Sequence, residues 1–393
     1  MNGTIYMPVG EVCSSISDTY REKKNMVTLI NTSDVLEGRV LNHERVPNSN
    51  LKGQFKKTFQ RDDILYSEIR PQNRRFAYVD FSPIDYIAST KLMVIRAKKD
   101  VVSPKYLYYF LKNSSTVAEL QLLAETRSGT FPQITFSEVA NLTIPVPPLA
   151  VQEVIVQTMQ CLEDKTICNE QINDNLEQQA QSYFQELFVD NADPEWTTGT
   201  ISDLGTVVGG STPSKAKPEY YTESGIAWIT PKDLSNNKSK FVSHGENDIT
   251  ELGLRNSSAS IMPEGTVLFS SRAPIGYIAI AAGEVTTNQG FKSVVPKPEI
   301  GTPFVYFFLK NTLPVIEGMA SGSTFKEVSG STMKNVPAVI PDAETLAKFS
   351  DFCAPIFAQQ RILEEQNQSL ATLRDNLLPK LMSGEIDVSA VQL

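Results

Sequence analysis

Five basic side chains in the first part of the chain have the types and spacing that suit contacts to nucleic acid. Arg70, Arg74 and Arg75 lie close together, and Lys56 and Lys57 precede them. Both residue types neutralise phosphates, and arginine reads guanine through two hydrogen bonds to O6 and N7. We therefore predict that these residues lie at a DNA-contacting surface and that at least one of the arginines reads guanine. The alternative is a solvated basic loop without a ligand.

Two short loops that contain glycine and hydroxyl residues lie next to further cations. Ser128, Gly129 and Thr130 follow Arg127, whereas Ser323 and Thr324 precede Lys326. Backbone amides and hydroxyl groups in such loops suit phosphate oxygens. Plain turns are the alternative interpretation of both loops.

The second half of the chain offers comparable donors and acceptors. The candidates there are Lys232, Arg272, Asn288, Gln289 and Lys292. Asparagine and glutamine pair with adenine in the major groove, but both also cap turns, so either role is open for Asn288 and Gln289.

The sequence carries no motif that predicts catalysis. No G-x-x-x-x-G-K-[ST] loop for ATP occurs, and the only Pro-Pro pair, Pro147–Pro148, is followed by leucine and not by the aromatic residue of an adenine methyltransferase motif. His43 and His244, the only histidines, lie far apart in the sequence. We expect a chain that is not an enzyme and that has no catalytic, cofactor-binding or metal-binding residues.

The cysteines and the apolar segments favour a cytoplasmic protein. The four cysteines form no C-x-x-C pair, and we expect Cys161 and Cys168 to be buried helix residues and not metal ligands. No apolar run approaches the roughly 20 residues that span a bilayer. The N-terminal residues lack the pattern of a signal peptide.

Charge is distributed unevenly along the chain. The formal net charge is −9, which does not suit a DNA-binding protein. Residues 51–112, however, carry 13 basic and 6 acidic side chains, whereas residues 149–195 carry 1 and 10. We expect the acidic segments to be helices that lie away from the phosphates.

The chain repeats itself after about half its length. Four segments recur in the same order at offsets of about 194 to 203 residues: 64–67 and 267–270, 106–113 and 304–311, 128–131 and 322–325, and 141–145 and 335–339. The first part of each repeat predicts a mixed α+β domain. Its expected strands include 90–95, 265–269 and 277–280, and its expected short helices are 104–112 and 303–310.

Each repeat ends in a long segment with a heptad pattern. The first seam runs through Ile155, Met159, Leu162, Thr166, Asn169, Asn173, Leu176, Ala180, Tyr183 and Leu187. The second runs through Leu346, Phe349, Cys353, Ile356, Gln360, Leu363, Asn367, Leu370, Arg374, Leu377 and Leu381. We expect Pro355 to kink or break the second helix and Pro379 to bend or end it.

These segments predict an α+β protein with a pseudo-two-fold internal repeat. Globular domains over residues 1–148 and 191–341 are separated by long helices over 149–190 and 342–393, and the helices form an antiparallel coiled coil. About 40 residues make a helix about 60 Å long. Domains held at its two ends would contact unlike sites one to two turns of duplex apart.

Several motifs resemble the specificity subunits of Type I restriction–modification systems, and the resemblance covers the whole chain. They are Ile144–Leu149 with Gln152, Trp228–Leu234, Thr287–Phe291 and the C-terminal segment Leu377–Ile386. The stretch Ala88–Leu92 stands in the first repeat where the second has the Asn-Gln-Gly form.

The resemblance implies that each globular part is a target recognition domain that reads one half of a bipartite, asymmetric site in double-stranded DNA. It implies that the helices set the spacer and dock two modification subunits, which bind S-adenosylmethionine and methylate adenine. Restriction subunits, which are ATP-dependent motor–nucleases, complete the complex, and no membrane is involved. The alternative is a non-catalytic coiled-coil adaptor that binds protein or glycan.

Overall fold

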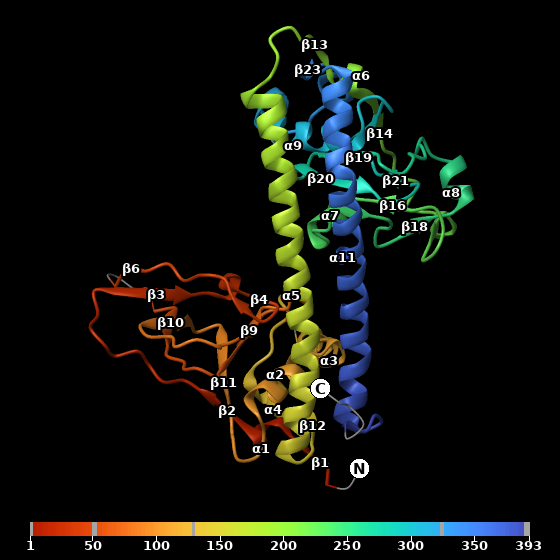
Figure 1. The fold of residues 1–393 in the computed structure, drawn as a ribbon. Coiled ribbons are helices and arrows are strands. Elements are labelled where there is room, and N and C mark those ends of the chain that lie inside the picture. Colours follow the sequence, from red (N-terminus) through yellow and green to blue (C-terminus); the bar gives the residue numbers. More distant parts are fainter. Residues whose placement is uncertain (1–2, 49–52, 128–129, 323–325, 389–393) are drawn as a thin grey trace. The chain divides into compact units, whose positions relative to one another are not determined.

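The computed structural model describes residues 3–48, 53–127, 130–322 and 326–388. Two compact units are found along the chain. Unit 1 comprises Met1–Thr166 with Ser369–Leu393, and unit 2 comprises Ile167–Gln368. Both units contain helices and sheets, as the sequence predicted (Figure 1).

In unit 1 the globular part has two four-stranded sheets. Their strand orders are β6-β3-β10-β7 and β2-β11-β8-β9, and the pairs β1-β12 and β4-β5 complete the unit. Its elements are β1 (Ile5–Pro8), α1 (Val9–Val12), β2 (Cys13–Ile16), β3 (Met26–Ile30), β4 (Val35–Leu36), β5 (Arg39–Val40), β6 (Val46–Pro47), β7 (Phe55–Lys57), β8 (Ile64–Ser67), β9 (Phe76–Tyr78), β10 (Tyr86–Ser89), β11 (Leu92–Ala97), α2 (Pro104–Lys112), α3 (Ser114–Arg127), α4 (Phe136–Asn141) and β12 (Thr143–Val146).

In unit 2 the main sheet has five strands in the order β14-β22-β19-β20-β17, and three two-stranded pairs accompany it. Its elements are β13 (Thr197–Thr200), α6 (Ile201–Leu204), β14 (Gly205–Gly209), β15 (Tyr221–Thr222), β16 (Trp228–Ile229), α7 (Pro231–Asn236), β17 (Phe241–Val242), β18 (Asp248–Ile249), α8 (Glu251–Arg255), β19 (Val267–Ser271), β20 (Ile275–Ala281), β21 (Thr286–Thr287), β22 (Lys292–Pro296), α9 (Thr302–Met319), α10 (Gly330–Lys334) and β23 (Pro337–Ile340).

The internal repeat that the sequence predicted is present in the topology. The strand order β2-β11-β8-β9 of unit 1 recurs as β14-β22-β19-β20 in unit 2, and all of these pairs are antiparallel. In each unit the first strand pairs with the last, because β1 pairs with β12 and β13 pairs with β23. The equivalent helices α2 and α9 bury aromatic faces, with Tyr106 and Phe307 among the fully buried side chains.

Two long helices follow the globular parts, namely α5 (Leu149–Gln185), which continues as a π-helix to Asp190, and α11 (Ala343–Ser383). They run antiparallel within each unit. In unit 2, Asn169 bonds to Asn367, while the ring of Tyr183, further along α5, contacts the ring of Phe352, earlier in α11. In unit 1, Met159 near the start of α5 shares a core with Leu381 at the end of α11.

The predicted seam of α5 is confirmed, since none of its ten positions is exposed. The expected break at Pro355 is wrong, because α11 continues through both Pro355 and Pro379. Each proline removes one backbone hydrogen bond, but the side chains around Pro355 are held by packing, with Cys353, Ile356 and Phe357 all buried.

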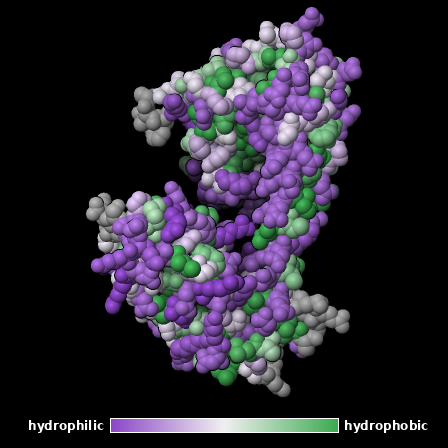
Figure 2. Space-filling view, turned by 60° about the vertical axis from the view of Figure 1, so that its left-hand side comes forward, coloured by the Kyte–Doolittle hydropathy of each residue, from purple (hydrophilic) through white to green (hydrophobic). Residues whose placement is uncertain are grey.

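Burial corrects the expectation for two cysteines. Cys161 and Cys168 are both exposed on α5, whereas Cys13 and Cys353 are buried. Within the described ranges no helix combines the length and the apolar character needed to cross a membrane. Hydrophilic side chains cover most of the face of each unit that is visible in Figure 2.

Candidate nucleic-acid interface

The end of strand β8 forms what we call the first corner, residues 67–71 together with residues 130–134. Ile134 N donates a hydrogen bond to Glu68 O at 2.9 Å, which joins the two segments. Arg70 lies between them with φ at +45°, in the left-handed region that side chains larger than glycine rarely adopt. Such conformations persist where the surrounding structure fixes them, and they are frequent at functional sites.

The first corner presents two cations of different character. Arg70 is exposed, and its guanidinium has no partner among the described residues. Lys91 Nζ donates to Gln133 Oε1 at 3.3 Å and lies 3.5 Å from Glu68 Oε2. Thr130 is exposed in the same corner. Arg70 therefore has the donors that a phosphate or a guanine edge would accept.

The other two arginines of the predicted cluster hold the fold together. Arg74 Nη2 donates to Ser114 Oγ at 2.9 Å, and Arg75 Nη1 donates to the carbonyl of Ser33 at 3.0 Å. Both side chains are half-buried. A guanidinium has five N–H donors, so neither arginine is excluded from DNA, but both are already engaged. Of the three arginines, only Arg70 is both exposed and free of partners within the described ranges.

Of the two predicted lysines, one is engaged within the fold and the other is exposed. Lys57 Nζ donates to the carbonyls of Thr90 at 3.1 Å and Leu92 at 2.8 Å, and burial lowers its pKa. Lys56 is exposed on the same strand. Arg127 forms an ion pair of 2.7 Å with Glu138 at the end of α3. The neighbouring positions Ser128 and Gly129 lie outside the described residues, as do Ser323 and Thr324.

The end of strand β19 forms the second corner, residues 270–275 together with residues 326–328. Val328 N donates to Ser271 O at 3.0 Å, and Ala273 has φ at +53°. This hydrogen bond is equivalent to the one in the first corner, because Val328 follows Ile134 by the repeat offset of 194 residues. The peptide bond before Pro274 is cis, whereas the one before Pro71 is not. Ala273 and Arg70 are both followed by proline.

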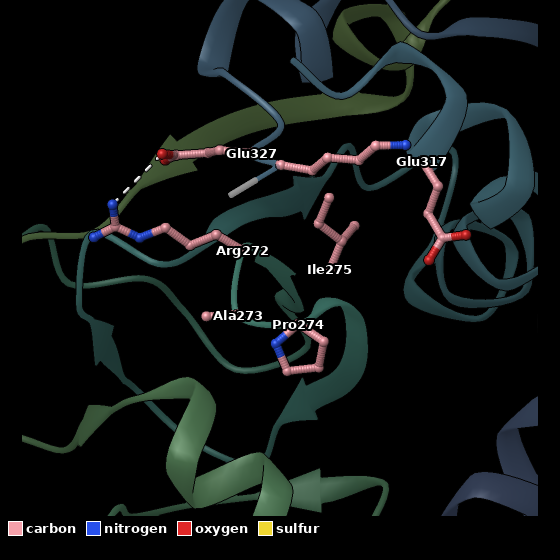
Figure 3. Close-up of a pocket in the computed structure, with 7 residues that line it drawn as sticks. Arg272, Ala273, Pro274, Ile275, Glu317 and Glu327 are labelled. Carbon is pink, nitrogen blue, oxygen red and sulfur yellow. Dashed lines mark hydrogen bonds and ion pairs between the residues drawn. The ribbon is translucent and has the colours of Figure 1, made fainter. Parts of the chain in front are cut away.

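A pocket of about 630 Å³ opens at the second corner, lined by Arg272, Ala273, Pro274, Ile275, Glu317, Lys326 and Glu327. Figure 3 shows Arg272 and Glu327 pointing toward one another, and their ion pair measures 3.4 Å. Lys292 Nζ lies 3.9 Å from the same carboxylate, and burial lowers the pKa of this lysine. Lys326 is exposed. Three cations and two carboxylates, Glu317 and Glu327, thus gather at this corner, and Glu327 is the one paired with Arg272.

The polar residues beside the second corner are engaged in turns. Asn288 Oδ1 accepts a hydrogen bond from Gly290 N at 2.8 Å, so the capping alternative describes this side chain in the free protein. Gln289 is exposed and accepts a bond from the Thr212 hydroxyl. Lys232 pairs with Glu246 at 2.6 Å on an exposed surface. The amide nitrogens of Asn288 and Gln289 remain available as donors.

The stretch Ala88–Leu92 matches the Asn-Gln-Gly stretch in backbone position. Glu68 N donates to Lys91 O at 3.0 Å, and Ser271 N donates to Gly290 O at 2.7 Å. Lys91 N also donates to the Ser89 hydroxyl, as Gly290 N donates to Asn288. The two corners therefore share backbone hydrogen bonds and differ in side chains. Such a pair can present two different sets of donors and acceptors to a ligand.

Sequence reasoning missed the acidic and amide groups that face these cations, namely Glu68, Gln133 and Glu327. Carboxylates repel phosphates, and Gln133 lies outside the basic clusters of the sequence, so none of the three was predicted to contact DNA. The repeat offset aligns Gln133 with Glu327 and was the one signal that could have found the pair. Lys91 was placed in a strand and in the stretch Ala88–Leu92 but not among the predicted DNA contacts, and it contacts Glu68 and Gln133 of the first corner.

The described residues hold no group of three or more His, Cys, Asp or Glu side chains that could bind a metal ion. The two histidines have ordinary partners. His43 Nδ1 lies 2.8 Å from the Tyr86 hydroxyl, and His244 Nδ1 lies 3.0 Å from an Asp248 oxygen.

Comparison with known proteins gives a consistent result. The family described as Type I restriction modification DNA specificity domain matches residues 6–178 and 194–373. The HindI specificity subunit of Haemophilus influenzae is 29% identical over 92% of this chain and 94% of its own length. The MjaIX specificity subunit of Methanocaldococcus jannaschii is 39% identical over 47% of this chain and 45% of its own length.

A solved structure supports the fold. The S subunit of a Type I restriction–modification system from M. genitalium superposes with a TM-score of 0.54 at 17% identity, over 97% of this chain and 96% of that one. The family match spans both repeats and most of the two long helices. The chain belongs to the family of Type I restriction–modification DNA specificity subunits.

Proposed function

We propose that this chain recognises a bipartite, asymmetric sequence in double-stranded DNA for its modification partners, and that it is not itself a catalyst. Residues 1–148 and 191–341 are the two target recognition domains, and residues 149–190 and 342–393 are the helices between them. The observation that carries the proposal is the corner that occurs twice with equivalent backbone hydrogen bonds, a positive φ before a proline and two sets of side chains.

Recognition at each corner combines two kinds of contact. Phosphate contacts fix the position of a protein on the duplex, while hydrogen bonds to base edges carry the sequence information. In the first domain Arg70 supplies a free cation and Lys91 supplies a weakly paired one. Lys56 and Arg127 lie nearby in the sequence. In the second domain Arg272, Lys292 and Lys326 supply the cations, and Asn288 and Gln289 supply amide donors.

The acidic segment 149–195 faces protein partners in this proposal. Its 10 acidic and 1 basic side chains would repel phosphates. Two modification subunits dock on the helices, and restriction subunits complete the complex. S-adenosylmethionine binds to the modification subunits, and ATP with Mg²⁺ binds to the restriction subunits. The complex assembles in the cytoplasm, where the DNA is.

The helices set the length of the spacer between the half-sites. Helix α5 has 37 residues, which correspond to about 55 Å at 1.5 Å per residue. One turn of duplex is about 34 Å, so recognition domains held by such helices would contact sequences one to two turns apart.

A domain exchange tests the proposal. Residues 1–148 are replaced by the corresponding segment of another specificity subunit, and the methylated sites of cells that carry the modification subunits are sequenced. One half of the site changes, whereas the other half and the spacer stay the same. Changes in both halves would contradict the proposal. Binding to duplex DNA that is absent or insensitive to salt would favour the adaptor alternative.

A further inference from the structure

The central residue of the second corner is an acid on a surface that we assign to DNA. Glu327 lies 3.4 Å from Arg272 and 3.9 Å from Lys292. A carboxylate among phosphate-binding cations lowers non-specific affinity for DNA, because it repels the backbone and occupies the cations. Its presence there therefore needs a reason other than affinity.

The exposure of the ion pair allows DNA to replace it. The Arg272 and Glu327 side chains are 38% and 40% exposed, so water reaches both groups. An exposed ion pair contributes little to stability. The pair can therefore open, or be shared with a ligand, at a small cost.

The hydrogen-bonding pattern of the pair matches one kind of base pair. In the major groove a G·C pair presents the N7 and O6 acceptors of guanine and the N4 donor of cytosine. Arg272 supplies two parallel donors, and Glu327 supplies an acceptor next to them (Figure 3). An A·T pair presents the order acceptor, donor, acceptor, so adenine N6 faces one N–H of Arg272 and thymine O4 faces the carboxylate.

We propose that Arg272 and Glu327 together read a G·C base pair in the major groove, and that Glu327 is a specificity-determining residue. In the other base pairs an acceptor lies at the position of the cytosine donor, so the carboxylate is repelled there and keeps Arg272 and Lys292 from the backbone. Rejection of wrong partners by an unpaired or repelled charge is a common route to specificity. The inference rests on the proposed function, since it assumes that the second corner contacts DNA.

The first corner provides an internal comparison. Gln133 occupies the position equivalent to Glu327 and bonds to Lys91 at 3.3 Å. An amide both donates and accepts, so it rejects fewer base edges and does not repel phosphate. The two domains therefore differ in how strongly this position excludes wrong sequences.

The test uses the full chain in complex with its modification subunits. A library of duplexes about 40 base pairs long with random sequence, enough to cover both half-sites and the spacer, is selected for binding and sequenced, and dissociation constants are measured for one unselected duplex. The wild-type chain selects a bipartite motif with an invariant G·C pair in the half assigned to residues 191–341 by the domain exchange.

In Glu327→Gln the preference at that G·C pair weakens, because the amide accepts from cytosine but also donates to other base edges, while the other positions keep theirs. Affinity for the unselected duplex rises about 5-fold, because two cations are released and a repelling charge is gone. Glu251→Gln is the matched control, since it removes the same charge from the exposed pair with Arg255 on α8 (Figure 1). This control keeps the wild-type motif and affinity.

A second variant tests the same idea in the other direction. Gln133→Glu places a carboxylate next to Lys91 and Arg70, and affinity for the unselected duplex falls about 5-fold. An unchanged G·C preference in Glu327→Gln, or unchanged affinity for the unselected duplex in both variants, overturns the inference and leaves the proposed function intact. A wild-type chain that selects no bipartite motif overturns both.

Discussion

At the scale of single residues, what separates a binding cation from a structural one is its partners. Arg70, Arg74 and Arg75 are alike in the sequence. Arg74 and Arg75 donate to Ser114 and Ser33, and only Arg70 is exposed without a partner in the described part of the chain. A free guanidinium meets a phosphate or a base edge without first breaking an internal bond.

Replacement of Arg70 tests this distinction. Arg70→Ala lowers the affinity for cognate DNA about 10-fold and reduces the slope of log K against log salt concentration by about 1 if the contact is to phosphate. Titration of the complex with its modification subunits at several salt concentrations measures both. Arg255→Ala, which removes an exposed arginine of α8, serves as the charge control. An unchanged affinity would exclude Arg70 from the interface.

Lys240 is a second residue whose role depends on partners that lie far away in the sequence. Its side chain is 6% exposed, and its ammonium group lies 2.6 Å from the Glu177 carboxylate and donates to Gln360 Oε1 at 2.7 Å. It also lies 3.8 Å from the centre of the Phe357 ring. This buried lysine therefore connects the sheet of unit 2 to both α5 and α11.

Loss of this ion pair destabilises the protein. Glu177→Gln lowers the free energy of unfolding by about 3 kcal/mol, because the buried Lys240 loses its carboxylate. Lys240→Met lowers it by less, because Glu177 keeps its ion pair with Lys310. Their effects are not additive, since both remove the same contact. Urea denaturation of the two single variants and the double variant measures the coupling. Additive losses would contradict the assigned pairing.

The same pair predicts a dependence on pH. Burial raises the pKa of Glu177, but Lys240 and Lys310 outweigh burial and hold it below its ordinary value. The stabilisation by Glu177 is therefore present at neutral pH and is lost as the pH falls below about 4.3, the ordinary pKa of glutamate. The difference in unfolding free energy between the wild type and Glu177→Gln shrinks in acid. A difference that persists there would contradict this sign.

A site residue could be predicted from the sequence where its role follows from its own chemistry. It could not be predicted where its role depends on contacts that only the tertiary fold makes. The types and spacing of Arg70 and Arg272 were sufficient to nominate them, because the chemistry of base reading is local. The engagement of Arg75 could not be predicted, since the carbonyl of Ser33 is brought near only by the tertiary fold. The role of Glu327 depends on three segments that meet at one corner.

At the scale of elements, the heptad pattern was the most reliable signal. The seam of α5 predicted a helix that is observed over 37 residues, and every seam position lies at a contact. The effect of Pro355 could not be predicted, because the packing of α11 decides whether a proline interrupts a helix. The three strands placed from the sequence correspond to β11, β19 and β20, whereas the other strands and the pairing order came from the structure alone.

The polar layer of the coiled coil lowers its stability. Asn169 is fully buried, and its Nδ2 donates to Asn367 Oδ1 at 2.8 Å. The Oδ1 atoms of Asn169 and Asn173 have no partner among the described groups. A buried acceptor without a partner costs free energy, whereas a buried polar pair specifies the register of two helices.

Replacement of the polar layer by leucine measures how much stability the layer costs the coiled coil. Asn169→Leu with Asn367→Leu raises the free energy of unfolding by about 1 kcal/mol, because an orphan acceptor is removed and apolar area is buried. Asn169→Leu alone raises the free energy of unfolding by less than the double variant does, or lowers it, since Asn367 then lacks its partner. Thermal and urea denaturation measure both variants. A double variant less stable than the wild type would show that the layer is stabilising.

At the scale of the whole molecule, the long helices determine the length of the spacer in the proposed function. Thr166 and Gln368 are the last residues before the chain passes from one unit to the other. An insertion after each of them leaves the contacts inside both units unchanged. Seven residues equal one heptad, which keeps the seam of each helix on its own face.

Sequencing of the methylated sites in cells that express such a variant with its modification subunits tests the central claim most directly. Insertion of one heptad at both positions lengthens each helix by about 10 Å, which is about 3 base pairs at 3.4 Å each. We predict that both half-sites are retained and that the spacer grows by about 3 base pairs. Methylation of the original site with an unchanged spacer would contradict the account.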